Sequence, residues 1–173
     1  MTLHFISTTP SVQIRLLQEI NTAIDAGTIT RPIIRDTEAR RLPYLQACIK
    51  EGLRMYPPVT GLLAKAVPRG GAELEPGMWA PGGTQIAWNS LGMMRLEEVF
   101  GADAEMFLPE RWMVRDESDK ERERVDRMTE TVGLVFGYGR FGCLGRGVAM
   151  MELNKAVIEV CCVVWESVGS DPS

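Results

Sequence analysis

The stretch Phe136–Gly147, with the sequence FGYGRFGCLGRG, places five glycines around a single cysteine, Cys143. Glycine allows positive φ angles and lets the backbone come close to a bulky group. The apolar, β-branched run Thr131–Val135 before this stretch is strand-like, and residues 148–165 after it have the pattern of a long helix. Cys143 is therefore expected at a helix N-terminus, where unpaired N–H groups and a partial positive charge favour the metal-binding thiolate over the thiol.

A lone thiolate in a glycine-lined loop suits the fifth ligand position of haem iron better than structural zinc, which takes about four protein ligands. One alternative interpretation is that Cys143 is an inert, buried small hydrophobe. Another is a dinucleotide site, because Gly137-x-Gly139-x-x-Gly142 follows a strand-like run and opens a helix. That fold needs further βα units, but no second strand follows the predicted helix. Kinases share the glycine spacing, but no His-Arg-Asp or Asp-Phe-Gly follows here.

Composition indicates one globular domain, since 45% of the 173 residues are hydrophobic and 24% are charged. The net charge of −4 argues against a nucleic-acid partner. The four cysteines include no Cys-x-x-Cys pair, which indicates a reducing compartment without a disulfide framework. His4 is the single histidine, and no nucleophile motif supports a Ser-His-Asp site. No apolar run reaches the roughly 18–20 residues of a membrane helix, so we expect no transmembrane segment in this chain.

Two further motifs precede the cysteine stretch. A helix is predicted over residues 42–56, with Pro43 in its first turn and Pro57-Pro58 after its end. It contains Glu51-x-x-Arg54, whose spacing places both side chains on one face. Pro109-Glu110-Arg111-Trp112 follows later in the chain. Together and in this order, the three motifs resemble those of cytochromes P450, and the cysteine stretch has the form common among filamentous fungi.

The resemblance implies a role for each motif residue. Cys143 would be the thiolate ligand of haem iron, and Phe136 would pack beneath the porphyrin. Arg140 and Lys65 would face the haem propionates or a reductase, although Lys65 could equally be a solvated lysine on an edge strand. The commonest family pattern has arginine two residues before the cysteine, where this chain has Phe141. A buried structural cluster is implied for Glu51, Arg54 and Arg111.

The implied fold is mainly α with a small β-sheet (α+β), the C-terminal part of a single cytochrome P450 domain over residues 1–173. Its segments would be the end of the distal helix and the helix after it (1–26), the Glu-x-x-Arg helix (42–56), the small sheet (59–88), the haem-cysteine loop (131–147) and the C-terminal helix (148–165). The charge-rich residues 114–129 are predicted to be a solvated loop. Six residues are predicted to form the core-facing side of the last helix: Val148, Met151, Ala156, Val157, Val160 and Val164.

The implied activity is a monooxygenase that inserts one atom of dioxygen into a small organic substrate, with electrons from NADPH through a separate NADPH–cytochrome P450 reductase. The intact relative would lie on the cytosolic face of the endoplasmic reticulum membrane, held by an anchor ahead of Met1. We expect the chain to be incomplete and, made alone, poorly folded and inactive. A non-catalytic haem-binding or interaction fragment is the alternative.

Overall fold

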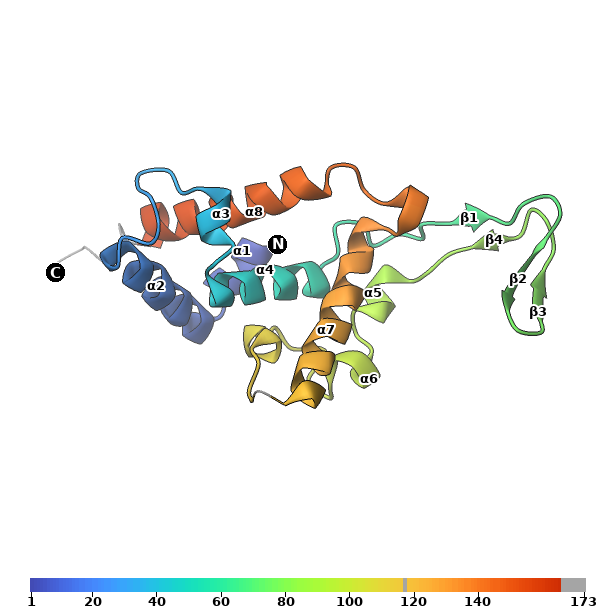
Figure 1. Cartoon of the computed structure of the whole chain (residues 1–173), viewed down its shortest axis with the longest axis horizontal. Helices are drawn as coiled ribbons and strands as arrows, with labels where there is room; N and C mark the ends of the chain where they lie inside the picture. Colours follow the sequence, from blue (N-terminus) through green and yellow to red (C-terminus); the bar gives the residue numbers. More distant parts are fainter. Residues whose placement is uncertain (117, 166–173) are drawn as a thin grey trace.

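The computed structural model describes residues 1–116 and 118–165. Helix α4 lies at the centre of the helical part of the molecule and contacts α1, α2, α7 and α8 (Figure 1). The longer helices are α2 (Pro10–Asp25), α4 (Pro43–Met55), α7 (Asp119–Gly133) and α8 (Arg146–Val160). The shorter ones are α1 (Thr2–Ser7), α3 (Asp36–Ala39), α5 (Ser90–Met93) and α6 (Glu97–Phe100).

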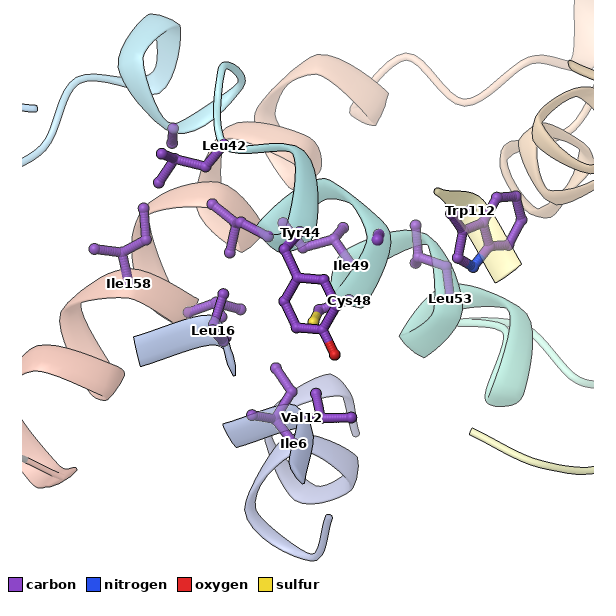
Figure 2. Packing of buried hydrophobic residues seen from close by; sticks show 14 of the residues in the cluster. Ile6, Val12, Leu16, Leu42, Tyr44, Cys48, Ile49, Leu53, Trp112 and Ile158 are labelled. Atoms are coloured by element: carbon purple, nitrogen blue, oxygen red, sulfur yellow. The ribbon is translucent and has the colours of Figure 1, made fainter. Parts of the chain in front are cut away.

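The first two long helices lie where the sequence predicts them. In α2, Val12, Leu16 and Ile20 are spaced four residues apart and are buried on one side. Helix α4 begins at Pro43, and its first turn is capped from α2, where the Glu19 carboxylate accepts the backbone N–H groups of Tyr44 at 2.8 Å and Leu45 at 2.9 Å. The residues that pack around α4 come from α1, α2, α8 and the Trp112 turn, as Figure 2 shows.

The strands form two separate two-stranded antiparallel ribbons in place of the single small sheet expected over residues 59–88. Strand β1 (Lys65–Ala66) pairs with β4 (Gln85–Ile86), with Lys65 opposite Ile86. Strand β2 (Ala72–Glu75) pairs with β3 (Met78–Ala80), in a hairpin that projects from the helical part (Figure 1). The fold is therefore mainly α with small antiparallel sheets.

The prediction of a solvated loop over 114–129 was wrong, because most of this segment belongs to α7. The hydroxyl of Ser118 accepts the Glu121 backbone N–H at 3.3 Å and caps the helix. Met128 and Val132, four residues apart, are 0% and 4% exposed. The strand-like run Thr131–Val135 is also helical, since α7 ends at Gly133 and continues into a 3₁₀ turn, η2 (Leu134–Phe136). Burial at helical spacing outweighs β propensity here.

The last helix begins at Arg146 and passes from α8 into a π-helical turn, η4 (Cys161–Trp165). Its predicted apolar face is correct only in part. Val157 is buried and Val160 half-buried, whereas Val148 and Met151 are 55% and 40% exposed and Ala156 is exposed. The difference arises because α3 and α4 pack against the second half of α8, where Asn154 is also buried. The side chain of Val164 lies outside the described part of the structure.

Candidate functional site

The cysteine loop presents its thiol outward. Cys143 is exposed, and its backbone N–H donates to the Phe136 carbonyl at 2.7 Å, which closes the loop. Gly137 adopts a φ of +76°, and a Cβ on it would lie 2.6 Å from the Phe141 carbonyl oxygen. Two residues after Cys143, Gly145 caps the start of α8. The loop is therefore fixed by tight backbone packing while its sulfur stays accessible, in contrast to the alternative of a buried, inert cysteine.

The other described cysteines have a different chemistry. Cys48 and Cys161 are 0% exposed, and burial raises the pKa of both thiols, that of Cys161 to about 12. Desolvation penalises the charged thiolate, so these two cysteines favour the protonated thiol. Cys143 is accordingly the described cysteine best placed to act as a metal ligand.

Three cations lie around the loop, and each contacts an aromatic ring. The Lys65 Nζ is 4.2 Å from the centre of the Phe141 ring, and the Arg140 Cζ is 4.6 Å from the same centre. The Arg146 Cζ lies 5.6 Å from the centre of the half-buried Phe136 ring. Within residues 1–116 and 118–165, none of the three cations pairs with a carboxylate.

The structure thus brings the sequence-predicted residues Lys65 and Arg140 together, and it places Phe136 against the hydrophobic core. Sequence reasoning missed Arg146 and the contact role of Phe141. The signal was present, since both residues belong to the quoted glycine-rich stretch. Nothing in that stretch alone indicates which ring each cation contacts, because Lys65 arrives from a strand more than 70 residues earlier.

A buried charged cluster lies on the α4 side of the molecule, and it contains the three residues predicted to form it. The Glu51 carboxylate accepts Nε and a terminal nitrogen of Arg54, each at 2.8 Å, and Nε of Arg111 at 3.0 Å. Glu51 and Arg54 are 0% exposed, and Arg111 is 2% exposed. Arg111 belongs to the 3₁₀ turn η1 (Pro109–Trp112), so the cluster joins this turn to α4.

Further partners, which sequence reasoning missed, complete the cluster. Glu51 also accepts the Trp112 indole N–H at 2.9 Å and the Leu108 backbone N–H at 2.8 Å. Arg111 pairs with Asp103 at 2.7 Å. Arg54 donates to backbone carbonyls of Met94, Ala104 and Met106. Every buried side-chain nitrogen or oxygen in the described residues has a hydrogen-bond partner, which is the condition for tolerating charges at this depth.

Helix α7 connects this cluster to the cysteine loop. The Arg124 guanidinium donates to the Arg111 backbone carbonyl at 3.0 Å and pairs with Glu121 at 2.6 Å. This pairing lowers the pKa of the Glu121 carboxyl to about 2. Lys50 of α4 donates to the Thr129 hydroxyl at 3.2 Å, and burial lowers the pKa of that amine. Because α7 runs on into η2, its position sets where the loop begins.

These residues fit a porphyrin with a thiolate-bound iron. The exposed sulfur of Cys143 can supply one soft ligand. Lys65 and Arg140 can pair with the carboxylates of such a group. In the described parts of the chain, no group of three or more His, Cys, Asp or Glu side chains could hold a metal ion. A dinucleotide site would require the glycine loop to follow a strand. The loop instead follows helix α7 and the 3₁₀ turn η2, so the structure does not support that alternative.

Comparison with known proteins agrees with the motifs. The family model of cytochrome P450 matches residues 1–160. The chain belongs to the cytochrome P450 family. It is 44% identical over 159 residues to cytochrome P450 monooxygenase ABA1 of Pyricularia oryzae (strain 70-15), and equally to aba1 of Botryotinia fuckeliana (strain B05.10). Cytochrome P450 monooxygenase abl1 of Leptosphaeria maculans is 43% identical over 155 residues.

The chain spans about a third or less of the length of these P450 relatives. The matches to ABA1 and to aba1 each cover 92% of this chain and 30% of the relative. The match to abl1 covers 90% of this chain and 26% of that relative. Over the described residues, no helix combines the length and the apolar character needed to cross a bilayer.

Proposed function

We propose that this chain carries the haem-thiolate centre of a cytochrome P450 monooxygenase that inserts one atom of dioxygen into a small organic substrate. The observation that carries the proposal is the exposed thiol of Cys143 in a loop whose backbone is closed by the 2.7 Å bond to Phe136. Family membership and the names of the relatives support the class of reaction.

In this proposal Cys143 is the iron ligand, and Phe136 lies beneath the porphyrin. Lys65 and Arg140 pair with its carboxylates, because their positive charges have no carboxylate partner in the described residues. The haem, when bound, supplies the activation of dioxygen, which electron donation from the sulfur favours. We further propose that the electrons come from NADPH through a separate cytochrome P450 reductase, at the endoplasmic reticulum membrane.

The buried cluster has a structural role in this proposal. Glu51, Arg54 and Arg111 hold α4 against η1, and α7 passes that constraint to the loop through Arg124. None of these side chains needs to touch the haem or the substrate. Their contribution is to keep the thiol at a fixed place while the surrounding charges remain available to a ligand.

The ligand assignment is tested by Cys143→Ser. Because the chain made alone is expected to be poorly folded, the test uses a chimera in which residues 1–160 replace the matching segment of ABA1. The chimera is loaded with haemin, reduced with dithionite and exposed to carbon monoxide, and the absorption band of a thiolate-ligated ferrous complex is recorded. We expect this band in the parent and its loss in Cys143→Ser, with an unchanged unfolding midpoint because the thiol is exposed. Cys48→Ala is the matched control: it should lower stability, since Cys48 is buried, but keep the band. An unchanged band in Cys143→Ser would reject the proposal.

The monooxygenase assignment is tested in a chimera. Residues 1–160 of this chain replace the matching segment of ABA1, and the chimera is assayed with NADPH, a cytochrome P450 reductase and the substrate of that relative. We expect one atom of isotopically labelled dioxygen in the product, and its loss with Cys143→Ser. A chimera that shows the thiolate band and no substrate-dependent NADPH oxidation would instead favour a haem-binding, non-catalytic segment.

A further inference from the structure

The Phe141 ring contacts two cations that come from different parts of the fold. Lys65 belongs to β1, and Arg140 precedes Phe141 in the 3₁₀ turn η3 (Gly139–Phe141). Their charged groups lie 4.2 Å and 4.6 Å from the same ring centre, and so they are no farther apart than the sum of these distances. Figure 1 shows the loop after α7 beside the segment that leads to β1.

This arrangement is unfavourable for the two cations by themselves. Like charges that are at most the sum of these two ring distances apart repel. Neither Lys65 nor Arg140 pairs with a carboxylate in the described residues. Attraction between each cation and the electron-rich ring offsets part of the repulsion. Phe141 is also 50% exposed, so its burial alone does not explain its position.

We propose that Phe141 is a positioning residue, whose ring holds Lys65 and Arg140 together as a paired cation site for the two carboxylates of the porphyrin. The inference rests on the proposed haem function and adds a residue to it. Phe141 stands at the position where the commonest family pattern has arginine. Its ring contacts both Lys65 of β1 and Arg140 of the loop. The ring makes no ion pair itself, and its effect passes through the two cations.

Two porphyrins separate a charge effect from a packing effect. The chimera with ABA1 is titrated with haemin, whose two carboxylates are free, and with haemin dimethyl ester, in which both are esterified. We expect Phe141→Leu to weaken haemin binding about two- to fivefold, the range of one cation–π contact at an exposed site, and to leave binding of the ester unchanged. Phe141→Tyr keeps the ring and should restore the parent ratio of the two dissociation constants.

A matched control comes from the same loop. Tyr138 is an aromatic residue with 80% exposure that makes no ring contact with a cation in the described residues, so Tyr138→Leu should leave both dissociation constants unchanged. In a chain that already carries Lys65→Gln and Arg140→Gln, Phe141→Leu should have no further effect on haemin binding. This double-variant background tests whether Phe141 acts through the two cations.

The outcomes distinguish this inference from the proposed function. If the chimera with the parent sequence folds but binds neither porphyrin, the haem function is rejected and the inference with it. If haemin binds and Phe141→Leu weakens haemin and ester equally, or weakens neither, the positioning role is overturned while the haem function stands. The same holds if Phe141→Leu retains its full effect in the Lys65→Gln, Arg140→Gln background.

Discussion

In the cluster around Glu51, the charged residues Glu51, Arg54 and Arg111 are at most 2% exposed and satisfy one another. In the loop around Cys143, the thiol and Arg140 are exposed. The cations there contact aromatic rings and pair with no carboxylate among the described residues. Both regions were predicted from sequence motifs, but they use charge differently. Charges that lose their hydration must find partners within the protein, whereas charges that await a ligand must remain unpaired and accessible.

This comparison separates the two kinds of motif residue. Replacing a member of the buried cluster should be measured in the free energy of unfolding. Replacing the thiol or one of the cations at the loop, Cys143, Lys65 or Arg140, should be measured mainly in ligand binding. A cluster variant that changed only ligand binding, or a Cys143, Lys65 or Arg140 variant that changed only the free energy of unfolding, would contradict this division of roles.

The largest effect is expected for Glu51→Gln. The substitution removes the negative charge shared by Arg54 and Arg111, which leaves the buried Arg54 with no carboxylate partner in the described residues and Arg111 with Asp103 alone. We expect a loss of about 3–5 kcal/mol in the free energy of unfolding, measured with urea. Glu105→Gln is the matched control, because Glu105 is 82% exposed in its pair with Arg95 and should contribute less than about 1 kcal/mol. Equal losses in the two variants would contradict the role given to the cluster.

An intermediate effect is expected for Gly137→Ala. The new Cβ would lie 2.6 Å from the Phe141 carbonyl oxygen at a φ of +76°. We expect about 1–3 kcal/mol of destabilisation, together with weaker haemin binding, because the loop must shift. Gly147→Ala in α8 has no atom within 4 Å and should instead be neutral or stabilising, by up to about 1 kcal/mol. Calorimetry of both variants checks the sign, and a tolerated Gly137→Ala would show that the loop is not tightly fixed.

The smallest effect is expected from the titration of Glu121. Its carboxyl pKa is lowered from 4.5 to about 2 by Arg124, so the folded state favours the carboxylate. The stabilisation is fully present above about pH 4.5 and is lost as the pH falls towards 2. Glu121→Gln should therefore make the unfolding midpoint less dependent on pH between 5 and 2. Glu123→Gln, on the exposed side of α7, should leave this dependence unchanged, and an equal change in both would argue against the Glu121–Arg124 pair as its source.

Sequence reasoning placed Glu51 and Arg54 together by helical spacing, and Arg111 only through the resemblance to cytochromes P450. Arg54 also donates to three backbone carbonyls that lie 40 to 52 residues further along the chain, and no local spacing predicts these contacts. Helix α7 was missed for a different reason. Most of its residues are charged, and only Met128 and Val132 are buried, so its apolar pattern is weak. Ser118 caps the helix, but a serine alone does not predict a helix that packs against α4.

Helix α7 also constrains how the chain length can vary. A flexible loop before the cysteine would absorb an added residue, but a helix rotates every later position by about 100° per residue. One residue inserted between Arg124 and Met128 would turn either the guanidinium away from the Arg111 carbonyl or the methionine out of the core. We therefore expect insertions and deletions to be tolerated in the exposed residues 114–116 and to be harmful within α7. The number of residues between the Ser118 cap and the Cys143 thiol is thus fixed by the helix.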